Sequence, residues 1–250
     1  MTGSLLDGRR AVITGAAQGL GEAMARAFLQ QGAAVVVADL DPQVSQRAAA
    51  ALAAETNGFA AGIACDVSDE DAVRRLADQA VAELGGVDVW VNNAGILRNR
   101  SLAEATLADF RDLIDVHVQG SWLGIKYAAP VMRADGGGSI INMSSIGGKA
   151  GLAGQTNYST AKAAIFGLTK AAAKELAPDR NRVNAILPGI MNTAMAAMLA
   201  PDDLARRVAD IPLGRLGDPA EVGSAAVFLA SDMASYVTGA MLEVSGGRFM

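Results

Sequence analysis

The 250-residue chain suits one large α/β domain or two small ones, and because half of it is hydrophobic it can bury a sizeable core. Its net charge of −5 comes without a cluster of Lys and Arg, so nucleic acids and anionic membranes are excluded as partners. The one cysteine, Cys65, excludes an intrachain disulfide, and no segment has the roughly 18 apolar residues of a membrane span. These facts predict a soluble, cytoplasmic globular protein.

From the N-terminus onward, short β-branched runs alternate with long amphipathic stretches rich in alanine. The predicted strands are Ala11–Thr14, Val35–Asp39, Ile63–Asp66, Val87–Asn92, Ser139–Met143, Val183–Leu187 and Met241–Val244. The predicted helices are Gly19–Gln31, Val44–Glu55, Glu70–Leu84, Thr106–Arg133, Tyr158–Leu176 and Pro219–Ala230. This alternation predicts a parallel sheet with helices on both faces. Because crossovers between parallel strands are right-handed, the predicted fold class is a doubly wound α/β fold.

No linker, repeat or low-complexity segment divides the chain, so residues 1–250 are predicted to form a single domain. The least regular region is 191–218, which breaks the alternation of strands and helices. Long irregular insertions near the C-terminal edge of a sheet are often lids or binding loops, so this region is the predicted substrate-binding loop. Its flexible or branched apolar side chains are Met191, Met195, Met198 and Leu199. They would either adapt to an apolar substrate or only pack the loop onto the core.

A glycine-rich turn follows the first strand and leads directly into a helix. It reads Thr14-Gly15-Ala16-Ala17-Gln18-Gly19-Leu20-Gly21, and its three glycines let the backbone turn tightly and approach a ligand closely. The N-terminus of the helix then offers free N–H groups and a partial positive charge to a pyrophosphate. The glycine spacing is wider than in the generic dinucleotide fingerprint, so the turn alone is equally consistent with a purely structural role.

The second strand ends at Asp39, close to the distance at which a carboxylate is expected to accept hydrogen bonds from the adenosine ribose of a dinucleotide. The same carboxylate would repel a 2′-phosphate, and nothing basic lies in the turn or just after Asp39 to receive one. NAD is therefore the predicted cofactor, and NADP is less favoured. The alternative is that Asp39 only caps the following helix.

A series of motifs in order along the chain resembles the short-chain dehydrogenase/reductase family, in its common branch of about this length. They are the T-G-x-x-x-G-x-G loop at Thr14–Gly21, the pair Asp66-Val67, the N-N-A-G turn Asn92–Gly95, the serine of Ser144-Ser145, the Y-x-x-x-K motif Tyr158–Lys162, and the R-V-N-x-x-x-P-G segment Arg182–Gly189 with Thr193. They span essentially the whole chain. The resemblance implies a Rossmann fold with a seven-stranded parallel sheet, a homotetramer, and an NAD(P)-dependent enzyme acting on a small alcohol or ketone.

The resemblance also implies which residues bind the cofactor. They are Gly15, Gln18, Gly19, Leu20, Gly21, Asp39, Leu40, Asp66, Val67, Asn93, Ala94, Gly95, Tyr158, Lys162, Pro188, Gly189, Ile190 and Thr193. Within this set, Lys162 would hold the nicotinamide ribose hydroxyls. Ile190 and Thr193 would contact the carboxamide and so decide which face of the ring points at the substrate.

Hydride transfer to a ketone leaves an alkoxide that must be protonated, and the reverse reaction needs a base. An isolated tyrosine has a pKa of about 10, too high for a base near neutrality. Lys162 follows Tyr158 by one helical turn, and its cation would favour tyrosinate, so Tyr158 is the predicted general acid/base. Spacing to Tyr158 selects Ser145, rather than Ser144, as the donor to the substrate oxygen.

Two positions depart from the family pattern. In the fourth long helix, His117 stands where the family usually has Asn, which holds a water that links the lysine to bulk solvent. A neutral imidazole could hold the same water, its reference pKa of about 6.5 would also let it carry the proton itself, or it could only pack. Near the C-terminus, Ser245 replaces the usual Asp before Gly246-Gly247, in a region expected to serve the fold or subunit contacts.

The leading hypothesis is an NAD-dependent interconversion of a secondary alcohol and a ketone, with an apolar cyclic, aryl or steroid-like substrate. A 3-oxoacyl thioester reductase is the enzymatic alternative. Docking of its acidic carrier protein would use Arg206, Arg207 and Arg215, although acidic residues are interleaved with them. A non-catalytic nucleotide-binding protein is a third possibility, which the intact Ser145, Tyr158 and Lys162 disfavour.

The sequence shows no motif for other kinds of catalytic site. No Cys/His cluster has metal-ligand spacing, so no catalytic metal is predicted. Cys65 is interpreted as a small buried residue. No G-x-S-x-G elbow surrounds Ser145, which argues against a serine hydrolase.

Overall fold

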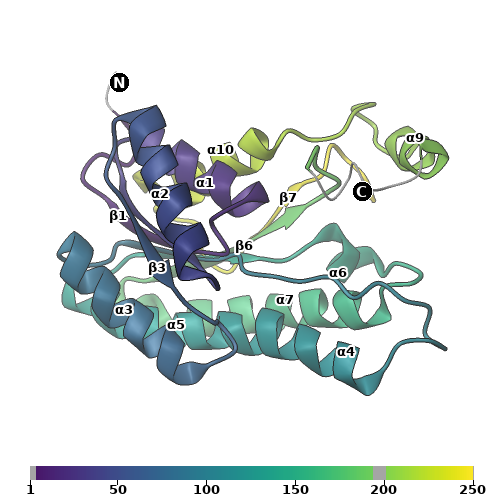
Figure 1. The fold of residues 1–250 in the computed structure, drawn as a ribbon, viewed down its shortest axis with the longest axis horizontal. Helices are drawn as coiled ribbons and strands as arrows, with labels where there is room; N and C mark the ends of the chain where they lie inside the picture. The colour runs from purple at the N-terminus through teal and green to yellow at the C-terminus, as the bar shows by residue number, and fades with distance from the viewer. Residues whose placement is uncertain (1–3, 194–200, 250) are drawn as a thin grey trace.

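The computed structural model describes residues 4–193 and 201–249 and contains a seven-stranded parallel sheet between two layers of helices (Figure 1). The strands are β1 (Arg10–Thr14), β2 (Ala34–Asp39), β3 (Ala60–Ala64), β4 (Val89–Asn92), β5 (Ser139–Met143), β6 (Arg182–Pro188) and β7 (Met241–Val244). Their order is β3-β2-β1-β4-β5-β6-β7, so the direction of winding reverses between β1 and β4. The predicted doubly wound parallel sheet is confirmed, and its ligand crevice is expected at this reversal.

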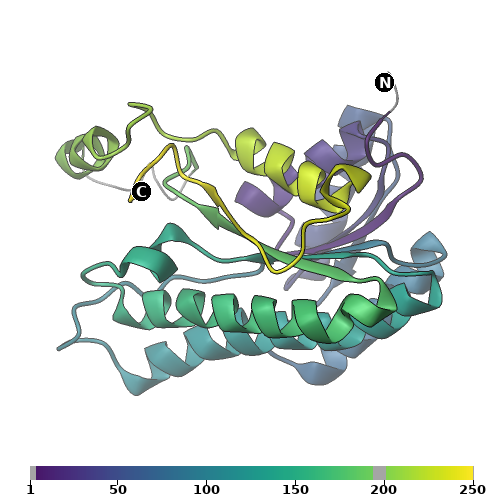
Figure 2. The same ribbon diagram turned by 180° about the vertical axis from the view of Figure 1, so that it is seen from behind.

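The helices divide between the two faces of the sheet (Figures 1 and 2). One layer holds α1 (Gly19–Gln30), α2 (Pro42–Thr56) and α10 (Pro219–Ala230), and the other holds α3 (Glu70–Leu84), α4 (Leu107–Leu113), α5 (Gly120–Ala134) and α7 (Thr156–Leu176). The short helices are α6 (Ile146–Ala150), α9 (Pro201–Ala209), η2 (Ala177–Asp179) and η3 (Asp232–Ala234). No helix among the described residues is long and apolar enough to cross a membrane.

Successive side chains of each strand point to opposite faces of the sheet and so contribute to two separate hydrophobic cores. In β2, Val35 and Val37 pack into the core beneath α1, α2 and α10, whereas Val36 and Ala38 pack into the core beneath α3, α5 and α7. All four side chains are buried. Because both faces are covered, the strand needs apolar residues at every position, which explains its uninterrupted Val-rich sequence.

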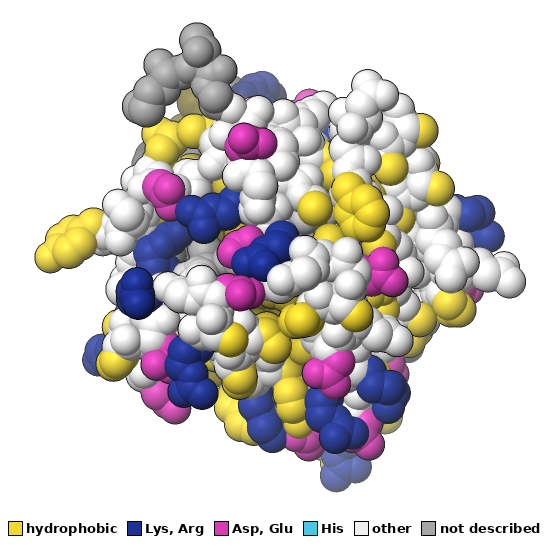
Figure 3. Space-filling model, turned by 90° about the vertical axis from the view of Figure 1, so that its left-hand side faces the viewer, with side chains coloured by type: hydrophobic (Ala, Val, Ile, Leu, Met, Phe, Trp, Pro, Cys, Tyr) yellow, Lys and Arg dark blue, Asp and Glu magenta, His cyan; other side chains and the backbone are white. Residues whose placement is uncertain are grey.

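Charged side chains of both signs cover the outside. On the face drawn in Figure 3, Lys and Arg are interspersed with Asp and Glu, and no extended patch of one sign is visible there.

The structure differs from the sequence prediction in two places near the site. The single helix predicted from Thr106 to Arg133 consists of α4, a π-helical segment η1 (Ile114–Gln119) and α5. The capping box of Thr106 and Asp109 sets its start as predicted. The π-helical segment was missed because the apolar period changes little over six residues, and such segments frequently lie at functional sites.

The second difference is that the region predicted to be irregular, 191–218, contains the helix α9. Its sequence carries the signals of a helix, with a proline at the start, acidic residues in the first turn and basic residues in the last: Pro201, Asp202, Asp203, Arg206 and Arg207.

The predicted β3 was also placed about three residues too late. Gly62 lies beneath α2 there, where a Cβ would come within 2.5 Å of the Gln46 backbone, so small residues rather than β-branched ones form this strand.

A buried chain of hydrogen bonds joins β4, β5 and α7. Trp90 Nε1 donates to Asn92 Oδ1 (2.8 Å), Asn92 Nδ2 donates to Asn142 Oδ1 (2.8 Å), and Asn142 Nδ2 donates to Thr169 Oγ1 (3.0 Å). All four side chains are at most 5% exposed. Since buried amides need partners, this series of hydrogen bonds fixes the depth at which α7 packs against the strands.

We predict that Thr169→Val lowers the free energy of unfolding by about 1–3 kcal/mol, because the substitution leaves Asn142 Nδ2 buried without an acceptor. Urea denaturation of the purified protein measures the change. Thr160→Val is the matched control, since the exposed Thr160 bonds only to the Thr156 carbonyl within the same helix. Equal losses in the two variants would contradict a special role for the buried chain.

Candidate active site

The residues singled out in the sequence gather at the carboxyl edge of the sheet. Parallel strands all end at this edge, so the segments that follow β1, β2, β4, β5 and β6 meet there. They carry the glycine turn Gly15–Gly21, the carboxylate Asp39, the turn Asn93–Gly95, Ser145, and the segment Pro188–Thr193. The carboxyl edge of the sheet between these segments is the candidate active site.

The glycine turn is held against the end of β4 by hydrogen bonds. Asn93 Nδ2 donates to the carbonyls of Thr14 (2.8 Å) and Gly15 (2.9 Å), and Thr14 Oγ1 accepts from the N–H groups of Asn93 and Ala94. Gly15 has φ +61°, and a Cβ at Gly21 would clash with the Gly15 carbonyl oxygen. Glycine is therefore required at both positions.

The N-terminus of α1 differs from those of its neighbours. Asp41, Asp69 and Asp218 cap α2, α3 and α10 with their side chains, whereas in the described chain the side chain of Gln18 makes no capping hydrogen bond to α1. Gly19 has φ +61°, and a Cβ there would meet no described atom within 4 Å. The first N–H groups of α1 therefore lack a side-chain acceptor, and the glycine beside them leaves room for a ligand. This arrangement fits a pyrophosphate.

The Asp39 carboxylate lies beside this turn and accepts from Ala17 N (3.1 Å) and Leu40 N (2.9 Å). The alternative role for Asp39 as a helix cap is wrong, because Asp41 caps α2 by accepting from the N–H groups of Gln43 and Val44. Asp39 is thus free for a ligand on its exposed side.

Other residues that are predicted to contact the cofactor lie in the segments that follow β3 and β6. Asp66 is exposed and its Oδ1 accepts from Ser68, while Val67 is buried where a Cβ on Gly120 would touch it. On the opposite side, Gly189 N donates to Val244 O (2.9 Å), and a Cβ on Gly189 would lie 2.8 Å from Ser245 Cα. Ser245 therefore belongs to the packing of the strand ends, as expected for this departure from the family pattern.

The predicted substrate-binding loop is closed at its base. Met191 and Gly217 form an isolated β-bridge, with hydrogen bonds from Gly217 N to Ile190 O (3.0 Å) and from Asn192 N to Gly217 O (2.7 Å). Thr193 follows the bridge, so both predicted carboxamide contacts lie at the base of the loop. Met195, Met198 and Leu199 lie outside the described residues.

Tyr158, Lys162 and Ser145 lie close together near the carboxyl end of β5. Lys162 Nζ lies 5.7 Å from the centroid of the Tyr158 ring and donates to the Met143 carbonyl (2.7 Å). Ser145 Oγ accepts from Gly147 N (3.0 Å) as the cap of α6, which leaves its own proton available for another acceptor. Ser144 is buried and donates to the Lys162 carbonyl (2.7 Å), so it serves the structure, and Ser145 faces Tyr158.

Burial changes the titration of the acid/base pair in a way that the sequence did not predict. It lowers the pKa of Lys162 to about 7 and raises the pKa of Tyr158, with the Ser145 side chain acting in the opposite direction on Tyr158. The pKa of Tyr158 is thus raised, whereas the sequence analysis expected Lys162 to lower it. The reason is desolvation, which disfavours the charged form of both groups.

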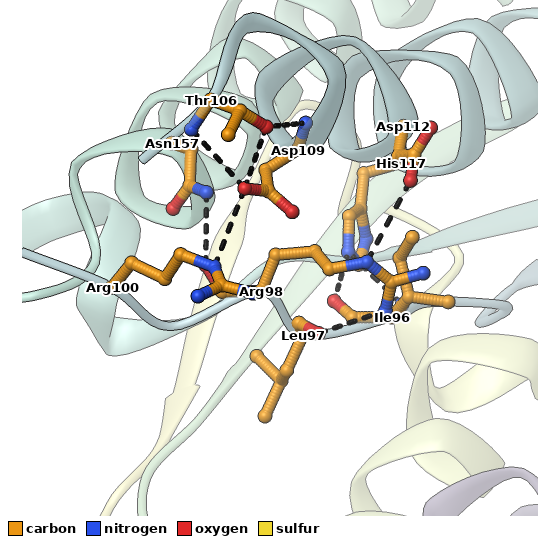
Figure 4. A network of polar contacts seen from close by, with 9 residues as sticks. All are labelled: Ile96, Leu97, Arg98, Arg100, Thr106, Asp109, Asp112, His117 and Asn157. Atoms are coloured by element: carbon orange, nitrogen blue, oxygen red, sulfur yellow. Dashed lines mark hydrogen bonds and ion pairs between the residues drawn. The ribbon is translucent and has the colours of Figure 1, made fainter. Parts of the chain in front are cut away.

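His117 lies in the π-helical segment, 3% exposed, with its ring edge-on to Tyr158 at 5.6 Å between centroids. Its Nε2 is 2.8 Å from the Ile96 carbonyl oxygen and 3.2 Å from the Ile96 nitrogen, and the shorter contact assigns the proton to Nε2 (Figure 4). Nδ1 is then an acceptor, buried with no partner among the described residues. Burial and the nearby Lys162 charge lower the pKa of His117 to about 3, which argues against the alternative in which the imidazole carries the proton itself.

One residue of the site was missed. Asn157 is buried beside Tyr158, and its side chain reaches both the Tyr158 N–H and the Arg98 carbonyl. Its place next to the Y-x-x-x-K motif was the available signal. Elsewhere, Cys65 is buried and its thiol pKa is raised to about 12, and no cluster of metal-ligating side chains occurs within residues 4–193 and 201–249.

Comparisons with known proteins identify relatives of the whole chain. A family model described as enoyl-(acyl carrier protein) reductase matches residues 15–248. An uncharacterized oxidoreductase of Mycobacterium bovis is 49% identical over 247 residues, 99% of both chains. The cis-4-hydroxycyclohexanecarboxylate dehydrogenase of Sinomonas cyclohexanicum is 44% identical over 240 residues, 96% of both chains.

Two further comparisons concern the acyl-carrier reductases and the fold. A 3-oxoacyl-[acyl-carrier-protein] reductase of Thermotoga maritima is 38% identical over 245 residues, 97% of this chain and 98% of the relative. The crystal structure of a short-chain type dehydrogenase/reductase from Mycobacterium marinum superposes with a TM-score of 0.91 at 39% identity, covering 98% of this chain and 96% of the other.

We predict that Lys162→Met raises the free energy of unfolding by a few kcal/mol near pH 7, since burial of the amine costs about 1.4 kcal/mol for each unit by which the folded pKa falls below that of the unfolded chain. The unfolded lysine holds its proton up to its ordinary value of 10.5, and the folded one only up to about 7. The cost of burial is therefore complete below about pH 7 and disappears as the pH rises toward 10.5.

Urea denaturation of both proteins between about pH 7 and pH 10 tests this linkage. The stability gained by Lys162→Met should shrink steadily as the pH rises. A gain that is constant with pH, or a loss of stability near neutrality, would show that the buried amine carries no such cost.

Proposed function

The chain belongs to the short-chain dehydrogenase/reductase family, and from this premise we propose that it is an NAD-dependent enzyme that interconverts a secondary alcohol and a ketone. The observation that carries the proposal is that Ser145, Tyr158 and Lys162 lie together at the same edge of the sheet as Asp39 and the uncapped N-terminus of α1. Residues 1–250 act as one catalytic domain, with 191–218 as its substrate-binding loop.

The residues present fit a dinucleotide. The N–H groups at the start of α1 would hold the pyrophosphate, Asp39 the adenosine ribose, and Lys162 the nicotinamide ribose. Ile190 and Thr193 would hold the carboxamide. When bound, the nicotinamide ring supplies or accepts the hydride and, in its oxidised form, adds a positive charge to the site.

The raised pKa of Tyr158 makes it a proton donor near neutral pH. In the reductive direction its hydroxyl protonates the substrate oxygen, while the free proton of Ser145 stabilises the charge that develops there. In the oxidative direction Tyr158 must first lose its own proton, and the resulting tyrosinate then accepts the alcohol proton. A lysine with a pKa of about 7 populates both forms near neutrality, so Lys162 can replace or remove the proton of Tyr158.

An apolar cyclic alcohol or ketone is the proposed substrate class. The relative from Sinomonas cyclohexanicum is named for a hydroxylated cyclohexane ring, at 44% identity. The alternative, a 3-oxoacyl thioester, has a named relative at 38% identity. It needs basic side chains for an acidic carrier, but Arg215 is held by both oxygens of Glu221 and Arg206 is paired with Asp203. These ion pairs favour the first class.

A homotetramer is the proposed assembly. The helices α4 and α5 carry large apolar side chains on their outer surface, with Phe110 38% and Trp122 50% exposed. Apolar surface of this kind supports packing between copies of the chain.

A panel of ketones and alcohols tests the function, with oxidation or formation of NADH followed by its absorbance. Turnover of cyclic or aryl ketones above that of 3-oxoacyl thioesters supports the proposal. Turnover of thioesters alone would select the alternative, and no turnover of any member would leave the non-catalytic nucleotide-binding protein.

Cofactor choice is the first quantity to measure. NADH should be used at least tenfold more efficiently than NADPH, because the Asp39 carboxylate and a 2′-phosphate would be close like charges. Asp39→Asn should narrow the preference, since it removes the charge and keeps the shape. Kinetics with both cofactors at subsaturating concentration give the ratio, and equal use of NADPH by the unmodified protein would sink the proposed preference.

Replacing Tyr158 by Phe should reduce kcat by about 10²–10⁴-fold while leaving NADH binding nearly unchanged, because only the proton-transfer group is lost. Lys162→Ala should weaken both, since it is assigned two tasks. Steady-state kinetics and fluorescence titration of NADH separate the two effects. A Tyr158→Phe enzyme that keeps substantial activity would require another acid.

We propose that His117 takes the relay position that Asn holds in relatives, with the buried Nδ1 accepting from a water or from Lys162. His117→Asn should then stay active, and His117→Ala should lose about tenfold or more. Because the His117 pKa is about 3, the pH–rate profile should show no limb near neutrality that His117→Asn removes. Full activity in a normally folded His117→Ala would leave only a packing role.

A further inference from the structure

The segment 96–106 connects β4 to α4 and runs beside the first turn of α7 (Figure 4). Two ion pairs tie it to α4, Arg98 with Asp112 (3.6 Å) and Arg100 with Asp109 (3.4 Å). Both pairs are long and both arginines are about half exposed, so they hold the segment weakly. Its position near Tyr158 must depend on other contacts.

Asn157 supplies a buried contact of the required kind. It precedes Tyr158 and is only 4% exposed. Its Oδ1 accepts from the Tyr158 N–H (2.8 Å), and its Nδ2 donates to the Arg98 carbonyl (3.0 Å). In the described structure the Gln155 side chain does not cap α7, so Asn157 satisfies an N–H of the first turn that would otherwise lack a partner. One amide therefore joins the catalytic tyrosine to the segment.

The contacts of the segment alternate along its backbone. The Ile96 carbonyl is bound by His117 and the Arg98 carbonyl by Asn157, both from the helix side. The side chain of Leu97, between them, points away from α4 and α7 in Figure 4. The two hydrogen bonds thereby fix which way Leu97 faces.

We propose that Asn157 is a positioning residue, which holds the segment 96–106 at a fixed distance from Tyr158 so that Leu97 forms a wall of the substrate site. This inference rests on the proposed function. Loss of the contact to the Arg98 carbonyl would loosen that wall without removing the acid, the lysine or the cofactor contacts. Substrate affinity should therefore suffer more than the chemical step.

Two substitutions of Asn157 separate its two hydrogen bonds. Asn157→Ala removes both. Asn157→Asp keeps the acceptor for the Tyr158 N–H but places an oxygen opposite the Arg98 carbonyl. That oxygen repels the carbonyl when the carboxyl is ionised and donates to it when the carboxyl is protonated, a form that burial favours as the pH falls. Thr160→Ala is the control, an exposed change on the same helix.

The expected result near neutrality is an increase of about tenfold in ketone KM for both variants, with a smaller fall in kcat and an unchanged Kd for NADH. Amide hydrogen exchange should become faster in residues 96–106, after correction for intrinsic rates, and not in the later turns of α7. Lowering the pH should return the KM and the exchange of Asn157→Asp toward wild type. Asn157→Ala should show no such recovery, and Thr160→Ala should match wild type throughout.

Unchanged exchange of residues 96–106 in both variants would overturn the proposal, as would a loss confined to kcat. Equal behaviour of the two variants at every pH would overturn the assigned bond to the Arg98 carbonyl. The exchange measurement needs no substrate, so it decides the role of Asn157 even if no ketone is turned over and the proposed function fails.

Discussion

The hydrogen bonds between Asn93 and the glycine turn are the constraint on which the site depends. The turn after β1 is where the chain leaves the sheet toward one helix layer, and the turn after β4 is where it leaves toward the other. The side-chain amide of Asn93 donates to two successive carbonyls and so fixes the position of one turn relative to the other. The start of α1, the Asp39 carboxylate and the β4–α4 segment all take their positions from that junction, because each follows directly from one of the two strands or packs against it.

The sequence was sufficient wherever periodicity or a short motif determines the structure. Uniformly apolar strands such as Ala34–Asp39 and amphipathic helices such as Glu70–Leu84 predicted the sheet and its two layers. Motif spacing brought Ser145, Tyr158 and Lys162 to one place. The sequence was insufficient where tertiary contacts override local preference. The start of β3 depends on close packing beneath α2, and the π-helical segment around His117 hardly changes the apolar period of the helix.

Charge was the hardest property to predict. A lysine one turn from a tyrosine suggests an ammonium beside a phenolate, but that reasoning assumes both groups remain solvated. In the folded protein Lys162 is 5% exposed, and its pKa approaches neutrality instead of remaining near 10.5. His117 shows the same effect. An exposed histidine has a pKa near neutrality, whereas burial holds this imidazole in its neutral form. Spacing in the sequence predicts which side chains lie close together, whereas burial decides their protonation states.

The uncapped start of α1 has a consequence for the lifetime of the protein. Neighbouring helices satisfy their first N–H groups with their own aspartates, whereas the first turn of α1 obtains no such contact from the side chain of Gln18. An anionic ligand that supplies the missing acceptors binds the folded chain and not the unfolded one, so it protects the fold by mass action. The abundance of the enzyme in a cell would then follow the supply of its cofactor, because molecules without it would open more often and be degraded sooner.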